Sequence, residues 1–170
     1  MKRHEGIHDL VAANIEQLPF PDRNFDLVSA NMVVEHLERP LDVLHEILRI
    51  LRPGGTFVFH TPNYRNPLTQ LAAITPQRVK NMVVRFFEGR AEEDVFPTFY
   101  RLNTLQKIME AAQSAGFEVR DLKLVSTSAL TMMLGPLAVP ELLWIRLTQM
   151  NAFAGLRPNI VAVLAKPMTR

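Results

Sequence analysis

The segment that decides the fold is residues 25–61, FDLVSANMVVEHLERPLDVLHEILRILRPGGTFVFHT. It begins with a short apolar stretch, Phe25 to Ala30, that predicts a β-strand. Apolar residues then recur at helical spacing, at Leu41, Leu44, Ile47, Leu48 and Leu51. Pro40 suits the first turn of this helix, and the Pro-Gly-Gly of residues 53–55 predicts its end. The apolar run Thr56 to Thr61 follows as a second strand, so the order predicts an α/β fold with a parallel sheet.

Similar patterns on either side of this segment predict further elements. Asp9 to Ala13 is short and apolar enough for a buried strand, and the two prolines of residues 17–22 predict a loop. Asn103 and Gln106 have the spacing of a capping box at the start of a helix. The later elements expected are an irregular helical segment at 67–88, a helix at 104–115, a strand at 117–125, a helix at 141–152 and a strand at 159–166.

Composition places the chain among globular proteins and excludes several kinds of site. Of its 170 residues 48% are apolar, and the net charge is only +2, which gives no argument for binding nucleic acid. The absence of cysteine excludes disulfides, thiolate zinc sites and a cysteine nucleophile, and the scattered histidines show no metal spacing. The polar N-terminus does not resemble a signal peptide, so we expect a cytoplasmic protein. Residues 124–140 carry no charge, but two prolines and a glycine oppose a spanning helix there.

Three sequence pieces in a fixed order carry a family resemblance. They are residues 14–22 (NIEQLPFPD), 25–37 (FDLVSANMVVEHL) and 46–55 (EILRILRPGG). Together they resemble class I S-adenosylmethionine-dependent methyltransferases of the type 11 kind. The pair Glu35-His36, with TPNYRNP at 61–67, is also similar to the ubiquinone-pathway O-methyltransferases. The match is strong over residues 9–67; beyond them only the order of helices and strands agrees.

The resemblance implies a fold and a division of the chain. It predicts a partial Rossmann-like methyltransferase sheet, strands 3 to 7 of a seven-stranded sheet, with helices on both faces. Residues 1–170 would form a single partial domain. Its parts would be a core at 9–66, a helical insert at 67–100, and a C-terminal sheet part with an apolar insert at 101–170.

The same resemblance assigns the cofactor, S-adenosyl-L-methionine, to the carboxyl ends of the strands, where ligands of open α/β sheets bind. In the family, an aspartate at the place of Asn14 accepts a hydrogen bond from the adenine amino group. The amide oxygen of Asn14 can still accept, without charge assistance. Ile15 would offer a backbone N–H and an apolar face to the adenine ring. Asn31 and Glu35 would lie on the methionyl side.

The acceptor side is assigned to histidine, tyrosine and arginine side chains. His36 has the pKa range suited to remove a hydroxyl proton, so it is the candidate catalytic base, with a ligand contact or a structural role as the alternatives. His60 and Tyr64 follow the next strand at its carboxyl end and are candidate substrate contacts. Tyr100 and Arg101 belong to a segment that would fold over the substrate, with packing under a loop as the alternative.

A glycine-rich cofactor turn is the family element that the sequence lacks. None of its seven glycines forms a G-x-G. We therefore expect that the family's first two strands would precede Met1. The family's sheet order is 3-2-1-4-5-7-6, so strands 4-5-7-6 would stay together, strand 3 would lose its neighbours, and strand 4 would become an edge. This chain alone should bind S-adenosylmethionine very weakly.

Three functional classes remain. The first is a methyltransferase acting on a small molecule, quinone precursor, lipid or glycan, with O-methylation expected first. The second is an inactive remnant or interaction module of the same fold. The third, a nicotinamide-binding α/β protein, does not explain the three pieces and ranks last. The apolar residues 124–145 suit core packing or, alternatively, a pocket or peripheral contact with the inner membrane for a lipid-like acceptor.

Overall fold

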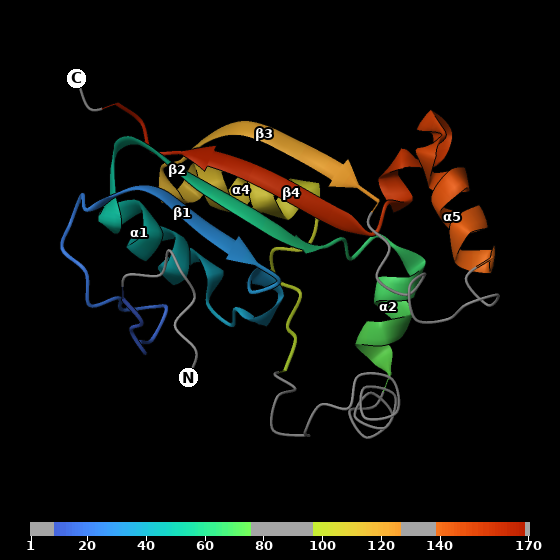
Figure 1. The fold of residues 1–170 in the computed structure, drawn as a ribbon, viewed down its shortest axis with the longest axis horizontal. Coiled ribbons are helices and arrows are strands. Elements are labelled where there is room, and N and C mark those ends of the chain that lie inside the picture. Colours follow the sequence, from blue (N-terminus) through green and yellow to red (C-terminus); the bar gives the residue numbers. More distant parts are fainter. Residues whose placement is uncertain (1–8, 76–96, 127–138, 169–170) are drawn as a thin grey trace.

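A mixed four-stranded sheet organises the chain in the computed structural model, which describes residues 9–75, 97–126 and 139–168 (Figure 1). The strands are β1 (Phe25–Asn31), β2 (Leu51–Pro62), β3 (Glu118–Val125) and β4 (Asn159–Ala165). Their order across the sheet is β1-β2-β4-β3. β1 and β2 are parallel, and β4 is antiparallel to both of its neighbours. This is the predicted order 4-5-7-6, so the expected α/β sheet and its edge strand are confirmed.

Helical elements connect the strands. The α-helices are α1 (Pro40–Ile50), α2 (Pro67–Ile74), α4 (Leu105–Ala115) and α5 (Val139–Gln149), and short 3-10 turns are η1 (Val34–His36) and η4 (Asn151–Leu156). Among the described helices, α1 and α4 pack against each other over one face of the sheet, as Figure 1 shows. α2 and α5 lie beyond the end at which β2 finishes.

The core lies between this face and the two helices. Alternate residues of the central strands are almost fully buried there, namely Phe57, Phe59, Ile160, Ala162 and Leu164. They meet the apolar stripe of α1, which includes Leu44 and Ile47, and that of α4, with Ile108 and Ala112. Along β2, buried residues alternate with half-buried residues that point to the opposite face of the sheet. The continuous apolar run of this strand had predicted burial on both faces.

α1 forms as its pattern predicts but ends earlier. Pro40 stands in its first turn, Asp42 complements the positive end of the helix dipole, and Arg49 complements the negative end. The helix ends at Ile50, before the Pro-Gly-Gly, because Leu51 already pairs with Phe25 as the start of β2. The glycine turn therefore lies inside the strand, where Gly54 has a left-handed φ of 78°.

Two local predictions are wrong. Asp9 to Ala13 forms no strand and is exposed, because no described strand lies beside it and an isolated strand leaves its backbone groups unpaired. α4 is capped by Thr104, whose side chain accepts from the backbone N–H of Lys107, and not by Asn103. Asn103 is fully buried and bonds elsewhere. Parts of the expected helix at 67–88 and of the apolar stretch 124–145 lie outside the described residues.

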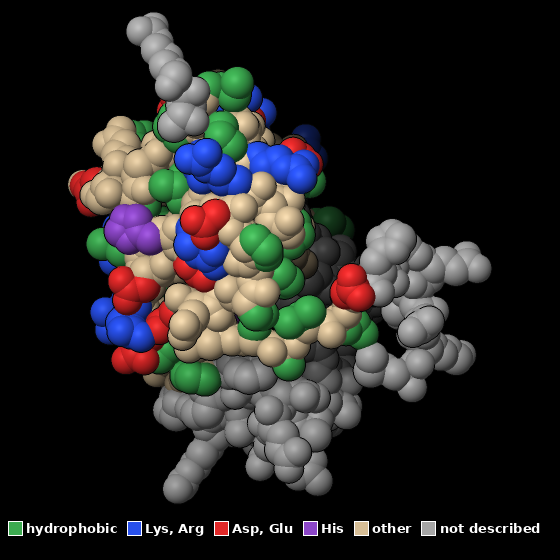
Figure 2. All heavy atoms as spheres, turned by 90° about the vertical axis from the view of Figure 1, so that its left-hand side faces the viewer, with side chains coloured by type: hydrophobic (Ala, Val, Ile, Leu, Met, Phe, Trp, Pro, Cys, Tyr) green, Lys and Arg blue, Asp and Glu red, His purple; other side chains and the backbone are tan. Residues whose placement is uncertain are grey.

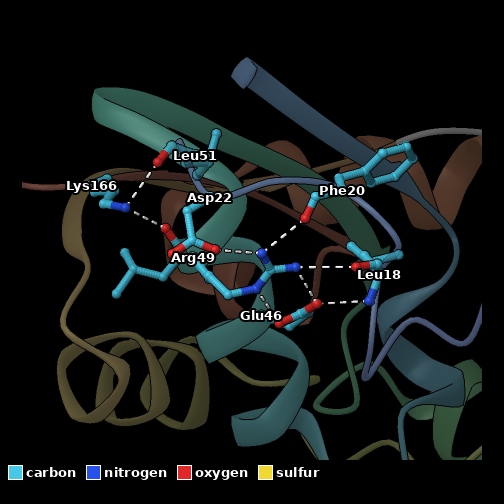
Figure 3. Close-up of polar contacts among 8 residues, drawn as sticks. Leu18, Phe20, Asp22, Glu46, Arg49, Leu51 and Lys166 are labelled. Atoms are coloured by element: carbon cyan, nitrogen blue, oxygen red, sulfur yellow. Dashed lines mark hydrogen bonds and ion pairs between the residues drawn. The ribbon is translucent and has the colours of Figure 1, made fainter. Parts of the chain in front are cut away.

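The loop before β1 is fastened to the end of α1 by one guanidinium (Figure 3). Arg49 donates to the backbone oxygens of Leu18 and Phe20, at 3.1 and 2.8 Å. It also binds the carboxylates of Glu46 and Asp22, which raises the pKa of Arg49 above its ordinary value and lowers that of Glu46. These bonds hold the predicted loop, and with it the segment that carries the candidate cofactor residues.

Basic and acidic side chains intermix at the end of the molecule where β1 and β2 start (Figure 2). Ion pairs in the loop and helix region account for part of this pattern: Arg49 with Asp22, Arg52 with Asp26, and Arg39 with Glu16. Because these pairs are largely solvent-exposed, each contributes little to stability.

Candidate functional site

The candidate site forms where the parallel strands β1 and β2 end. Asn31 closes β1 and pairs in register with His60 of β2. The Oδ1 atom of Asn31 lies 2.8 Å from Nδ1 of His60, and the backbone N–H of Met32 donates to the oxygen of His60 at 2.9 Å. The sheet thus brings together two of the predicted residues, one from the cofactor side and one from the acceptor side.

The turn η1, directly after β1, carries Glu35 and His36. Nδ1 of His36 lies 2.7 Å from the backbone oxygen of Pro97, and this contact brings the candidate base to the segment that begins α4. A cavity of about 430 Å³ opens beside it, lined by Met32, Val33, His36 and Pro97. The candidate base therefore faces a space that a ligand can enter.

Glu35 points into the protein. Its side chain is only 3% exposed, and its Oε2 accepts from the hydroxyl of Thr61 at 3.1 Å. Its backbone oxygen accepts from the N–H groups of Phe99 and Tyr100, at 2.8 and 3.2 Å. A buried carboxylate is retained only where donors satisfy it, so Glu35 joins β1, β2 and the segment before α4.

The predicted acceptor residues form two aromatic contacts. The rings of Tyr64 and Tyr100 lie with their centroids 5.4 Å apart, at an interplanar angle of 40°. The guanidinium of Arg101 lies 6.0 Å from the ring centroid of Phe99. Tyr100 has a left-handed φ of 51°, which a tyrosine adopts only where its surroundings hold it. The structure thus pairs Tyr64 with Tyr100 although 36 positions separate them in the sequence.

Asn14 and Ile15 lie in the loop before β1. Asn14 is exposed, and its Oδ1 accepts from the backbone N–H of Glu16 at 3.0 Å, as in an Asx turn. Ile15 is half-buried and lines an apolar cavity of about 190 Å³ between this loop, β1 and α1. The atom expected to accept from an adenine amino group therefore already holds a backbone N–H of its own loop.

The described residues fit part of S-adenosylmethionine. Two parts of the cofactor find suitable side chains. Asn14 and Ile15 have the chemistry expected beside the adenine ring, and Asn31 has the chemistry expected beside the methionyl group. The four described glycines, Gly54, Gly55, Gly116 and Gly155, lie in β2, after α4 and in η4, so none of them offers a backbone cradle beside Asn14 or Asn31. The described residues therefore do not make a complete site for this cofactor.

The role of two residues of the site could not be predicted from the sequence. Thr61 and Asn103 are both fully buried and share a hydrogen bond of 2.7 Å. In the sequence, Thr61 has the pattern of an ordinary strand residue. Asn103 is predicted to be a helix cap because Asn favours that position. Only the fold shows that the two meet, since they lie 42 positions apart.

In the described part of the chain, no group of three or more His, Cys, Asp or Glu residues is arranged to hold a metal ion. No helix that the structure describes is long and apolar enough to cross a membrane.

Known proteins similar to this chain are methyltransferases. A family described as a methyltransferase domain matches residues 1–59. A probable S-adenosylmethionine-dependent methyltransferase of Mycolicibacterium smegmatis is 31% identical over 113 residues, which make up 66% of this chain and 36% of that protein. A demethylmenaquinone methyltransferase of Chlamydia trachomatis is 31% identical over 94 residues, 53% of this chain and 41% of that protein. The chain thus spans well under half the length of these curated relatives.

Solved structures agree on the fold. An S-adenosylmethionine-dependent methyltransferase of Methanosarcina mazei superposes with a TM-score of 0.56 at 14% identity, over 92% of this chain and 66% of that one. One from Mesorhizobium loti gives 0.54 at 15% identity, over 91% and 67%. At these identities, the likeness concerns the fold alone.

Proposed function

Because residues 1–59 match a methyltransferase-domain family and the chain is similar to a probable S-adenosylmethionine-dependent methyltransferase, we propose that it is part of an enzyme that transfers a methyl group from S-adenosylmethionine to a small-molecule acceptor. The cofactor supplies an electrophilic methyl on sulfur. The observation that carries the proposal is the gathering of Asn31, His36 and His60 at the shared carboxyl end of β1 and β2, beside an open cavity. In open α/β sheets this end is where ligands bind.

The residues divide into two sides. Asn14, Ile15 and Asn31 contact the cofactor, and Glu35 belongs to the same side through its place in η1. His60, Tyr64, Tyr100 and Arg101 contact the acceptor. The cavity beside His36 is lined by Met32, which directly follows Asn31, and by Pro97, which lies shortly before Tyr100 and Arg101; this supports the division. An in-line displacement needs the acceptor atom about 3 Å from the methyl carbon, so holding the acceptor in place is the main task of the second group.

O-methylation is the proposed reaction, with His36 as the base that takes the hydroxyl proton. Its support is geometric. One ring nitrogen of His36 lies against the oxygen of Pro97, and the side chain lines the cavity. The pKa range of an imidazole suits it to take up a proton near neutral pH. The proposed acceptors are quinone precursors, lipids and glycans; one similar protein is a demethylmenaquinone methyltransferase, which favours quinone precursors.

A lipid-like acceptor also motivates a proposed peripheral contact with a membrane through residues 124–145. In the described part of this stretch, α5 exposes apolar side chains, among them Val139, Leu142 and Leu143, which are 51–62% exposed. Flotation with liposomes of anionic and neutral lipids tests this contact. Protein that stays at the bottom of the gradient with both compositions rejects it.

The transfer assay follows radiolabel from the methyl group of S-adenosylmethionine into extracted acceptors, using protein expressed from its complete gene. Catechol-type quinone precursors, fatty acids and glycans serve as acceptors, and label in one of them is the expected result. Absence of label with every acceptor, together with absence of cofactor binding, favours the second candidate, an inactive remnant or interaction module. The amide that replaces the family's aspartate at Asn14 is the observation that favours that candidate.

A further inference from the structure

We propose that Asn103 is a positioning residue, which acts through Thr61 and Glu35 to fix the Tyr64–Tyr100 pair relative to the turn that carries His36. The inference rests on the proposed function only in assigning the tyrosines to the acceptor side. The contacts themselves form a continuous buried path from the start of α4 to the end of β1, which we call the Asn103 relay.

Hydrogen bonds in this relay run in one direction. The amide nitrogen of Asn103 donates to the hydroxyl oxygen of Thr61 at 2.7 Å, and the Thr61 hydroxyl donates to Glu35 Oε2 at 3.1 Å. The second amide hydrogen of Asn103 reaches the backbone oxygen of Pro62 at 2.9 Å. Because each donor is polarised by the next acceptor and the path ends on a carboxylate, the bonds strengthen one another.

The amide of Asn103 can take only one orientation. A flip would turn its oxygen toward the oxygen of Pro62 and would remove the donor from Thr61. In the observed orientation its Oδ1 is buried with no hydrogen-bond partner in the structure. A buried amide oxygen without a partner costs free energy, so the two N–H bonds of Asn103 must compensate for it. These bonds order Thr61 and Pro62.

The same residues hold both tyrosines by the main chain. The backbone oxygen of Asn103 accepts from the N–H of Tyr64 at 2.7 Å, and that of Glu35 accepts from the N–H groups of Phe99 and Tyr100. Tyr64 follows β2, and Tyr100 precedes α4. The relay connects the two anchoring points through its hydrogen bonds, and this bond pattern maintains the left-handed backbone of Tyr100.

A direct contact with substrate is excluded for all members of the relay. Asn103 and Thr61 are 0% exposed, and Glu35 is 3% exposed. Their effect on a ligand must therefore pass through the residues that they hold.

Fluorine NMR of the full chain tests the relay without a cofactor or an acceptor. Tyr64 and Tyr100 are its only tyrosines, so labelling with 3-fluorotyrosine gives two signals, both at the site. Tyr64→Phe and Tyr100→Phe assign them. Thr61→Val keeps the shape of the side chain and removes the hydroxyl, so we expect both signals to shift and broaden. Thr61→Ser retains the hydroxyl and is expected to restore the wild-type positions.

Thr148→Val is the matched control, because Thr148 is also 0% exposed and its hydroxyl bonds to Ile145 within α5 and to Ser126, both outside the relay. It is expected to leave both signals in place. Wild-type signals in Thr61→Val, equal changes in Thr148→Val, or failure of Thr61→Ser to restore them would each overturn the proposal.

Amide hydrogen exchange of the wild-type chain covers the case in which Thr61→Val does not fold. The N–H groups of Phe99 and Tyr100 should exchange at least about 100-fold more slowly than in an unstructured peptide, because Glu35 binds both. Exchange at the peptide rate rejects the relay. Neither the NMR nor the exchange measurement involves methyl transfer. A result that rejects the relay is therefore distinct from a negative radiolabel assay, which would reject the proposed function.

Discussion

Gly116 ends α4 with its backbone in the left-handed region, at φ 89°, and its N–H donates to oxygens of the last helical turn. A Cβ added there would meet only the Leu48 side chain, at an ordinary 3.6 Å. The position therefore demands glycine for its backbone conformation and not for lack of space.

Gly116→Ala is expected to lower the free energy of unfolding by about 1–2 kcal/mol, the cost of a left-handed L-residue. Urea denaturation followed by circular dichroism measures it. Gly155→Ala is the control, because its φ is not left-handed and no atom lies within 4 Å of the added Cβ. It should change stability by less than about 0.5 kcal/mol. Equal losses in the two variants would show that the φ angle is not the cause.

His36→Gln is expected to lower methyl transfer by about 10²- to 10⁴-fold, the usual contribution of a general base. The radiolabel assay measures the turnover, with saturating acceptor. His45→Gln, at an exposed position of α1, is the control and should retain activity. If His36→Gln changes neither the turnover nor the affinity for the cofactor, His36 has only a structural role.

Among the elements, those with a strong local pattern were predictable. β1 and α1 follow from apolar spacing and from Pro40, and the strand pairing follows from their order. Asp9 to Ala13 has the local pattern of a strand, but no described strand lies beside it. A segment with this pattern forms a strand only where another strand pairs with it, and local sequence does not contain that information. Asn103 and Thr104 both suit a helix cap, so the choice depended on burial, which local sequence does not contain.

The candidate site was predictable to a similar extent. Asn31 and His60 could be placed together because parallel strands end at one edge of a sheet. The contact between Tyr64 and Tyr100 depends on how residues 97–103 return to β2, which no periodicity specifies. The hydroxyl of Thr61 gave no signal because threonine is common in strands whatever its partners.

The contact between the loop and α1 should depend on pH. Arg49 lowers the pKa of Glu46 below its ordinary value of 4.5 by hydrogen bonding to the carboxylate. Such a group stabilises the fold fully above the ordinary pKa, and this contribution is lost as the pH falls through the lower folded value. Glu46→Gln should therefore reduce the melting temperature at pH 7 but progressively less below about pH 4.5.

Thermal melts of both proteins between pH 3 and pH 7 measure this difference. Asp22→Asn is the control, because Asp22 is 70% exposed beside the same Arg49 while Glu46 is 13% exposed. Its effect should be smaller at every pH, since water screens it. A Glu46→Gln difference that is constant with pH contradicts the assignment.

For the whole molecule, β1 is one of the two edge strands of the described sheet. Leu27 of this strand is 60% exposed, and no described strand pairs with its outer edge. The candidate cofactor residues Asn14 and Asn31 lie near the same side of the sheet, and neither has a described glycine cradle next to it. Cofactor binding by the 170-residue chain should therefore be weak.

Calorimetric titration of the chain with S-adenosylmethionine is expected to give a Kd weaker than about 1 mM. Asn14→Asp should bind more tightly than wild type, because a carboxylate adds charge assistance while it can still accept from the Glu16 N–H. Stoichiometric binding by the wild type in the micromolar range contradicts this expectation, as does an unchanged affinity in Asn14→Asp.

The position of β4 in the centre of the sheet governs the order in which the chain can fold during translation. β4 lies between β2 and β3, yet it leaves the ribosome about 100 residues after β2. At about 5–20 residues per second, β2 waits roughly 5–20 s for this partner. Lys166, which donates to the oxygens of Leu48 and Leu51 at the end of α1, arrives later still. The nascent protein therefore presents an unfilled strand edge of β2 to chaperones until β4 has been synthesised.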